Sequence, residues 1–421
     1  MYLPTELRRC FGERDSQCEW TLAADAESMR LRWCVEGVLS NQIEVVYAIS
    51  DLHGDAGLFV FWLESAGLVR RVKRGGRSDY EWVAPRAALV VCGDAVDDHR
   101  GGYDGPDRDA ALLSRNFEGF KDAVPGSGSW NVLAFINYLV ARCGARIVVV
   151  LGNHELMSIR DESAEYKRDV TKRVETKRGG WGPGGGMRGL LGETPLVAVC
   201  AGSLLLMHAE PPIFGADAAR DDFGFGGSGS SGSSGSRAGG AGGPRRRAEH
   251  FTRWINDRAR GLVDPLVGLS LWGRNLGSDL EKRPEACGKY RSALPGVTLV
   301  RGHCPNRAEQ PPLLGGHEGL AFGAPNLVDG ARLAAASGCS PRGCAVYTAS
   351  GPSDLVPRGS GYGGVVVSCG AREDPGFGGS VFRIDCMGSL AFDLRERPCS
   401  VVAFEVATGR AYCLVGERPV R

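Results

Sequence analysis

Ser50-Asp51-Leu52-His53-Gly54-Asp55 directly follows an apolar, β-branched run at residues 44–49, which is typical of a buried strand. Alternate side chains of an extended chain point the same way, so Asp51 and His53 can face one site. A carboxylate and an imidazole presented together at a strand end supply part of a coordination shell for a metal ion. Asp-x-His after a strand also occurs by chance, so the other strand ends decide whether this pair marks a site.

Four more apolar runs end in the same types of residue. They lie at residues 87–92, 146–151, 204–207 and 297–300, and Asp, Asn or His follows each within three residues. Four of the seven histidines stand at these five strand ends: His53, His154, His208 and His303. Open α/β sheets bind ligands in the crevice beyond the carboxyl ends of their strands. The pattern therefore predicts one site built from several strand ends.

The same segments, taken in order, resemble the motifs of the calcineurin-like metallophosphoesterases. The segments are SDLHGD (50–55), GDAVDD (93–98), GNHE (152–155), HAE (208–210) and RGH (301–303). They are most similar to the phosphoprotein phosphatase (serine/threonine phosphatase) branch, whose patterns read GDxHG, GDxVDRG, GNHE, HGG and RGH. Two later segments look like pieces of the bacterial-like phosphatases in that branch, namely LWGRN (271–275) and FRIDCMGS (382–389). The order of all these motifs makes the resemblance specific, and it covers most of the chain.

This resemblance implies an α/β fold in which two mixed β-sheets pack as a sandwich flanked by helices. Because the motifs are so widely spread, we expect one catalytic domain, residues 44–421, after an N-terminal helical cap at residues 1–43. Two Gly-rich segments, 225–243 and 315–379, should be flexible insertions into that domain. The first is Gly/Ser-rich and cannot bury enough apolar surface to offset the entropy lost on ordering.

By the same resemblance, six residues bind two metal ions: Asp51, His53, Asp94, Asn153, His208 and His303. Asp94 would be shared by both ions, Asp51 and His53 would complete one shell, and the other three residues would complete the second. Two metals about 3.5–4 Å apart can clamp the attacking and leaving oxygens of a phosphoryl transfer. All six ligands offer nitrogen or oxygen, so manganese, iron or zinc fits better than an ion selected by thiolates. The sequence does not choose among these three metals.

Two further residues match the acid catalysis of the family. His154 corresponds to its general acid, and Asp97 to the carboxylate that orients this imidazole. Such an arrangement is chemically sound, because an imidazolium held by a carboxylate can protonate a leaving alkoxide. A histidine of the apolar core is the alternative interpretation of His154.

The sequence departs from the family pattern at one position that bears on the substrate. Asp98 stands where the family motif has an arginine that grips the phosphate. A carboxylate there would repel a phosphate, so the departure bears on how the substrate is oriented more than on metal binding. Arg100, two residues further on, and Arg274, in the LWGRN segment, are the two candidates to grip the phosphate instead.

The resemblance favours a phosphatase that acts on phosphoserine or phosphothreonine in proteins. A hydrolase of small phosphate esters or dinucleoside polyphosphates is the enzymatic alternative. A non-catalytic binding protein that kept the fold is the other alternative, and Asp98 favours it. The complete ligand set argues against that third interpretation, because unpaired carboxylates and imidazoles destabilise a fold when they are buried.

Composition limits the partners. A net charge of +1 over 421 residues gives no bulk field for nucleic acid or for an anionic membrane, so nucleic acid is not an expected partner. The N-terminus lacks an apolar signal core, and no apolar run reaches the roughly 18 residues that span a bilayer. The 14 cysteines form no short-spaced framework, so we expect reduced thiols and a cytoplasmic location.

Local patterns predict several elements outside the motifs. Helices are expected at residues 22–38, 56–69, 130–142 and 244–262, a basic hairpin or loop at 70–77, and a mobile loop at the glycine-rich segment 179–192. Late strands are expected near residues 345–348, 363–368, 381–385, 401–406 and 411–415.

Overall fold

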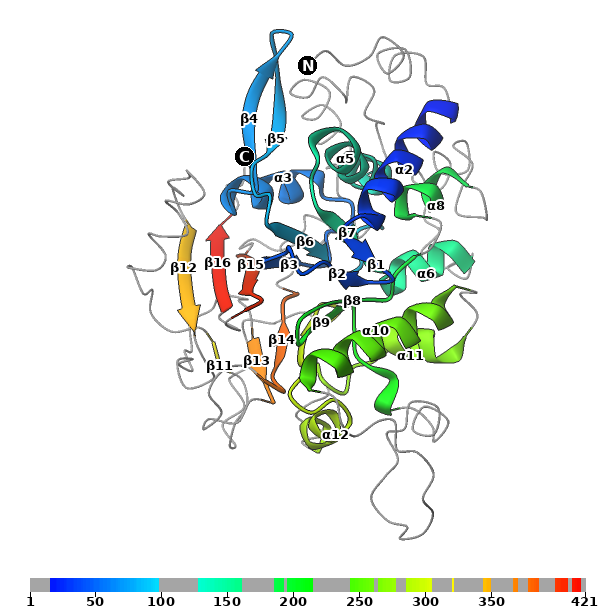
Figure 1. Ribbon diagram of the computed structural model, residues 1–421, viewed down its shortest axis with the longest axis vertical. Helices are drawn as coiled ribbons and strands as arrows, with labels where there is room; N and C mark the ends of the chain where they lie inside the picture. The colour runs from blue at the N-terminus through cyan, green and yellow to red at the C-terminus, as the bar shows by residue number, and fades with distance from the viewer. Residues whose placement is uncertain are drawn as a thin grey trace.

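Two β-sheets lie at the centre of the computed structural model, with helices over their outer faces (Figure 1). The structure describes residues 16–97, 128–160, 185–192, 195–214, 243–260, 264–277, 285–304, 320–321, 344–349, 366–369, 378–385, 398–407 and 411–417. The predicted α/β fold with two mixed sheets is thus confirmed.

The smaller central sheet has six strands in the order β12-β16-β15-β3-β6-β7. Their bounds are Cys344–Ala349 (β12), Ala411–Glu417 (β16), Pro398–Glu405 (β15), Val45–Ile49 (β3), Ala87–Val91 (β6) and Ile147–Val149 (β7). Strands β3, β6 and β7 are parallel to one another, while β15, β16 and β12 pair antiparallel. The three strands that precede the first three motifs are therefore neighbours, and their carboxyl ends share one edge.

The larger sheet has eight strands in the order β1-β2-β8-β9-β10-β14-β13-β11. Their bounds are Cys34–Val35 (β1), Val38–Leu39 (β2), Ala198–Ala201 (β8), Leu204–Met207 (β9), Thr298–Arg301 (β10), Val381–Arg383 (β14), Val366–Ser368 (β13) and Leu320–Ala321 (β11). Strands β9, β10 and β14 run parallel. A separate hairpin of β4 (Val69–Arg74) and β5 (Arg77–Trp82) projects from the body (Figure 1).

Side chains alternate between two apolar layers along each central strand. Val46 and Ala48 of β3 belong to the layer between the sheets, together with Leu206 of β9. Tyr47 and Ile49 belong to the layer under the helices. Because both faces of these strands are buried, the sequence reads as continuous apolar runs and not as an alternating pattern.

Nine helical segments surround the sheets. They are α2 (Ser16–Leu31), α3 (Ala56–Ser65), α5 (Gly128–Cys143), α6 (Asn153–Arg160), α8 (Gly186–Leu191), η2 (Pro212–Phe214), α10 (Pro244–Ala259), α11 (Pro265–Trp272) and α12 (Ala286–Ala293), counted over the described residues. The Asp55 carboxylate caps α3 by accepting a hydrogen bond from the Leu58 amide at 2.8 Å. This cap begins the helix directly after the first motif.

Three sequence predictions are wrong in part. The predicted helix at residues 22–38 ends at Leu31, because a left-handed turn at Glu36 and Gly37 connects β1 to β2. The predicted mobile loop at 179–192 contains α8, whose buried Met187 and Leu190 lie where this helix packs on α2 and α5. All cysteines were expected to be reduced, but Cys287 of α12 and Cys369, which follows β13, form a disulfide.

Other predicted elements are confirmed, and some predicted segments fall outside the described residues. The helices at 130–142 and 244–262, the hairpin after residue 69 and the late strands are present, each with shifted ends. Segments 98–127, 161–184 and 215–242 lie outside the described residues, which includes nearly all of the Gly/Ser insertion. The division into a cap and a catalytic domain stays a prediction.

No helix in the described part of the chain is both long and apolar enough to cross a membrane.

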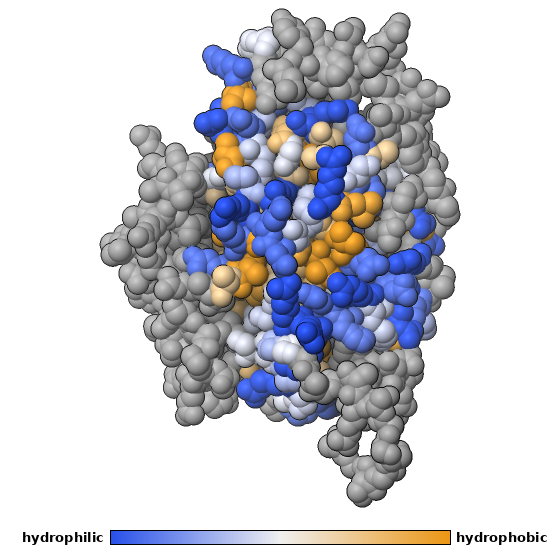
Figure 2. All heavy atoms as spheres, viewed as in Figure 1, coloured by the Kyte–Doolittle hydropathy of each residue, from blue (hydrophilic) through white to orange (hydrophobic). Residues whose placement is uncertain are grey.

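Large apolar side chains reach the surface at a few separate places. Polar and apolar side chains are intermixed on the face in Figure 2. In the described part of the chain the exposed ones are Leu31, Val35, Val83, Leu269 and Trp272. Leu269 and Trp272 both belong to α11, and the Trp272 ring meets the His303 ring edge-on at 5.9 Å.

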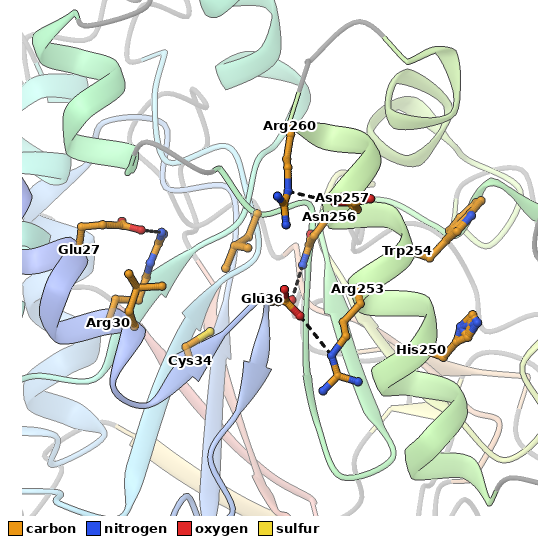
Figure 3. A pocket seen from close by; sticks show the side chains of 12 residues that line it. Glu27, Arg30, Cys34, Glu36, His250, Arg253, Trp254, Asn256, Asp257 and Arg260 are labelled. Carbon is orange, nitrogen blue, oxygen red and sulfur yellow. Dashed lines mark hydrogen bonds and ion pairs between the residues drawn. The ribbon is translucent and has the colours of Figure 1, made fainter.

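Asn256 fastens the N-terminal strands to α10, beside a cavity of about 620 Å³ (Figure 3). Its side-chain oxygen accepts hydrogen bonds from the amides of Val197 and Ala198, at 2.8 and 3.0 Å. Its side-chain nitrogen donates to the carbonyls of Ala198 and Glu36. Gly37 has φ +85° and lies so close to Asn256 that a Cβ there would overlap its amide. One buried side chain thus satisfies four backbone groups.

We expect Asn256→Ala to lower the free energy of unfolding by about 3 kcal/mol, because it leaves buried amides and carbonyls unsatisfied. Chemical denaturation monitored by circular dichroism measures this loss. Asp257→Asn, one residue further along α10 and largely exposed, is the matched control and should change stability little. An equally stable Asn256→Ala protein would show that water replaces these hydrogen bonds.

Candidate metal centre

The carboxyl ends of five strands, three from one sheet and two from the other, meet at one place. The segments after β3, β6 and β7 supply Asp51, Asp94 and Asn153. The segments after β9 and β10 supply His208 and His303. All five side chains are buried. The six-stranded sheet therefore contributes mainly oxygen atoms as candidate ligands, and the eight-stranded sheet contributes imidazoles.

Oδ2 of Asp94 lies at the middle of this group. The Nε2 atoms of three histidines surround it, those of His53 at 3.9 Å, His154 at 3.6 Å and His208 at 3.4 Å. The other Asp94 oxygen accepts a hydrogen bond from the His154 amide at 3.1 Å. Two groups of three residues, each able to hold one ion, share Asp94: one adds His53 and His154, and the other adds His208 and His303.

Asn153 joins the second group. Its Oδ1 lies 2.8 Å from Nε2 of His208 and 3.0 Å from Nδ1 of His303. These two histidine nitrogens are themselves 3.1 Å apart. Three predicted ligands of the second ion thus present their donor atoms to one point.

Asp51 connects the two sides of the centre. Its Oδ1 lies 3.9 Å from Nε2 of His53, and its Oδ2 accepts a hydrogen bond from the His303 amide at 3.1 Å. Ser50 also donates its hydroxyl to Oδ2. All six residues that the sequence resemblance assigns to metal are therefore brought together.

The histidine tautomers fit a bound cation. Nδ1 of His53 lies 3.2 Å from the Val96 carbonyl oxygen, and Nδ1 of His208 lies 2.9 Å from that of Cys92. A carbonyl oxygen only accepts, so each Nδ1 carries the hydrogen and each neutral ring presents an Nε2 lone pair to Asp94. Metal-binding histidines typically donate their second nitrogen in this way. Lone pairs that face a carboxylate repel it unless a cation lies between them, so these residues fit metal ions.

Burial opposes charge on the ligands. It raises the pKa of Asp51 to about 7, with a further contribution from the Asp385 carboxylate. It also raises the pKa of Asp94 well above its usual value. Burial lowers the pKa of His208 and of His303, so both imidazoles are neutral. A bound cation would offset the cost of keeping the carboxylates ionised.

The backbone at the centre is strained. Five of its residues have a positive φ: Asp51, His53, Asp94, Asp97 and His303. In the described part of the chain only two other non-glycine residues share this conformation, Glu36 and Cys369. Left-handed backbone is unfavourable for residues with a Cβ and gathers at functional sites. The observation supports a functional site at these strand ends, independently of the side-chain chemistry.

Sequence reasoning gave no role to Glu155, which organises the loop around Asp94. Its buried carboxylate accepts hydrogen bonds from the Gly152 amide at 2.7 Å and the Asp94 amide at 3.0 Å. It also accepts from the amides of Ala95 and Val96, at 2.7 and 3.1 Å. The four donors fix the chain that carries Asp94. The signal was its place as the fourth letter of GNHE, but three of its four partners lie about 60 residues earlier in the sequence.

His154 and Asp97 form a pair beside this group. Nδ1 of His154 lies 2.6 Å from Oδ2 of Asp97. The Asp97 amide donates to the Ser129 hydroxyl of α5 at 3.0 Å. Nε2 of His154 therefore faces Asp94, as the Nε2 atoms of His53 and His208 do.

Of the two candidate arginines, the structure describes one. Arg274 follows α11 and is exposed, and its Nε donates to Nε2 of His303 at 3.4 Å. It thus lies at the rim of the centre. Arg100 and Asp98 lie outside the described residues.

Comparison with known proteins gives one relative and several structures. An uncharacterized protein of Schizosaccharomyces pombe is 33% identical over 118 residues, so the match spans 28% of this chain and only 27% of that protein. A metallophosphoesterase from Sphaerobacter thermophilus is 12% identical over 90% of this chain and 89% of its own, with a TM-score of 0.36. A protein serine/threonine phosphatase from Saccharomyces cerevisiae, with similarity to human phosphatase PP5, is 13% identical over 72% and 77%, with a TM-score of 0.37.

The family assignment rests on a broader match. Residues 45–305 fit the family model of the calcineurin-like phosphoesterases. This range includes more than half of the chain and all five strand ends described above. The chain therefore belongs to the calcineurin-like phosphoesterase family, whose members are metal-dependent phosphoesterases.

Proposed function

We propose that the protein is a binuclear metallophosphatase that hydrolyses phosphomonoesters, with phosphoserine and phosphothreonine in proteins as its substrates. The pair formed by His154 and Asp97 carries this proposal, because Nδ1 and Oδ2 lie 2.6 Å apart beside Asp94. A proton donor held in this way serves a substrate whose leaving group needs protonation. Serine and threonine alkoxides are such leaving groups.

Six residues would hold the metals, and manganese, iron or zinc would suit their nitrogen and oxygen donors. They are Asp51, His53, Asp94, Asn153, His208 and His303. Asp94 would be shared, since it belongs to both groups that can hold an ion. When bound, the metals would polarise the phosphoryl group and acidify the attacking water.

The remaining residues act on the substrate. Asp97 keeps the hydrogen of His154 on Nδ1, which directs Nε2 of that ring to the centre. A proton held at Nε2 would pass to the leaving oxygen as its bond to phosphorus breaks. Arg274, exposed at the rim, would donate charge-assisted hydrogen bonds to the phosphate. Arg100 stays a second candidate for that role.

We expect Asp94→Asn to remove most bound metal and nearly all hydrolysis. The substitution keeps the shape of the side chain but removes the charge that both ions would share. Elemental analysis measures the metal, and the melting temperature with and without manganese measures its binding to the folded protein. Wild type and the surface variant Asp257→Asn should gain stability from manganese. About two metals per chain in active Asp94→Asn protein would contradict the binuclear assignment.

We expect His154→Asn to slow hydrolysis of a phosphoserine peptide by about 10²–10⁴-fold, the usual contribution of a general acid. Hydrolysis of nitrophenyl phosphate should fall much less, because nitrophenolate leaves without a proton. Asp97→Asn should show the same asymmetry more weakly, since it only orients the ring. Both rates are measured in manganese-loaded protein.

The metal content of the same variants separates two roles for His154. Its Nε2 lies near Asp94 at a distance similar to those of His53 and His208. Metal content near that of wild type, with unequal losses on the two substrates, supports the acid. Loss of metal, or equal losses on both substrates, would make His154 a ligand or a positioning residue.

A further inference from the structure

We propose that Glu210 is a positioning residue that holds Arg274 at the rim of the metal centre. This inference rests on the proposed function, in which Arg274 binds the substrate phosphate. Glu210 is the last residue of the HAE segment, two positions after His208, and it is buried. It lies where the family pattern quoted above has a glycine, so the resemblance assigns it no role.

The Glu210 carboxylate binds the backbone that carries Arg274. Its Oε1 accepts hydrogen bonds from the amide and the side-chain nitrogen of Asn275, at 3.2 and 2.6 Å. Its Oε2 accepts from the Leu276 amide at 2.7 Å. The Gly277 amide in turn donates to the Arg274 carbonyl at 3.0 Å. The residues on the carboxyl side of Arg274 are thus fastened to one carboxylate.

Arg301 completes the attachment from the neighbouring strand. This fully buried residue ends β10, two positions before His303. Its Nη1 lies 3.5 Å from Oε2 of Glu210, and its Nη2 donates to the Gly273 carbonyl at 3.3 Å. Gly273 and Leu276, on the two sides of Arg274, are therefore linked to the ends of β9 and β10. Those are the same strands that deliver His208 and His303.

The segment from Gly273 to Gly277 packs closely against Glu210 and Arg301. A Cβ on Gly273 would overlap the Glu210 side chain, and a Cβ on Gly277 would overlap Cys304. Neither overlap involves backbone strain, since neither glycine has a positive φ. The absence of a side chain at Gly273 lets the segment approach Glu210 closely, and this packing limits the movement of the Arg274 backbone.

Metal binding at His303 would remove one contact of the Arg274 side chain, so the attachment of its backbone to Glu210 would matter more. In the structure, Nε of Arg274 donates to Nε2 of His303. A His303 that binds metal through Nδ1 must carry its hydrogen on Nε2, so it can no longer accept from Arg274. The guanidinium would then be available for phosphate, and the position of its backbone would decide where it reaches. Glu210 controls that position.

A double-mutant cycle tests this coupling. The variants are Glu210→Gln, Arg274→Ala and the pair together, and Glu210→Gln keeps the size of the side chain but loses its charge. The measurements are the Kd of inorganic phosphate by calorimetry and the KM and kcat for nitrophenyl phosphate, all in manganese-loaded protein. Metal content and melting temperature are recorded for each variant.

We expect Arg274→Ala to weaken phosphate binding and raise KM by about 10-fold or more, the usual effect of losing a hydrogen bond between charged groups. Glu210→Gln should raise both several-fold, with kcat and metal content near those of wild type. In protein that already lacks Arg274, Glu210→Gln should have almost no further effect on either constant. Asp257→Asn, a change at an exposed side chain of α10, is the control and should leave both constants unchanged.

Two results would overturn the proposal. Equal effects of Glu210→Gln with and without Arg274 would give Glu210 a structural role alone. Wild-type phosphate binding in Arg274→Ala would show that Arg274 does not bind phosphate, and Glu210 would then have no positioning role. The metal centre is tested separately by Asp94→Asn. If Glu210→Gln does not fold, Asn275→Ala replaces it, because it removes one contact of Glu210 and keeps the buried pair with Arg301.

Discussion

One carboxylate oxygen, Oδ2 of Asp94, has three imidazole nitrogens within 3.9 Å, and the residue is only 2% exposed to solvent. This arrangement is unfavourable for the protein alone, because burial disfavours the carboxylate charge and the neutral imidazoles offer lone pairs. A cation removes the conflict. The surrounding structure keeps the carboxylate and the imidazoles close together. Glu155 does so most directly, because its carboxylate accepts hydrogen bonds from the amides of Asp94 and Ala95.

The same contacts hold the two sheets together. Nδ1 of His208, from the eight-stranded sheet, donates to the Cys92 carbonyl of the six-stranded sheet. The amide of His303 donates to the Asp51 carboxylate across the same boundary. A shift of one sheet relative to the other would therefore break ligand contacts. The interior layer that contains Val46 and Leu206 resists such a shift, because a close-packed apolar layer does not deform easily.

Sequence could identify the strand ends because strands buried on both faces are uniformly apolar, so a polar residue after each one is conspicuous. The motifs that follow these strands then allowed Asp94 and His208 to be assigned as metal ligands by resemblance to the family. Sequence reasoning could not find the roles of Glu155 and Glu210, because most of their partners are backbone amides, which every residue has. The disulfide of Cys287 and Cys369 was missed because the pairing depends on how α12 lies against β13, 82 residues away in sequence. Glycines suggested mobility near α8, but Met187 and Leu190 bury that segment.

The left-handed backbone at the metal centre bears on how such an enzyme responds to directed evolution. A residue with a Cβ costs about 1–2 kcal/mol in this conformation, and a glycine avoids that cost. Asp51, His53, Asp94 and His303 all hold it. A selection for heat resistance of the metal-free protein would thus favour glycine at the positions proposed to bind metal, and a stabilised variant would lose its chemistry first. Libraries of this protein need a screen for catalysis at every round, since stability and ligand donors compete for the same few residues.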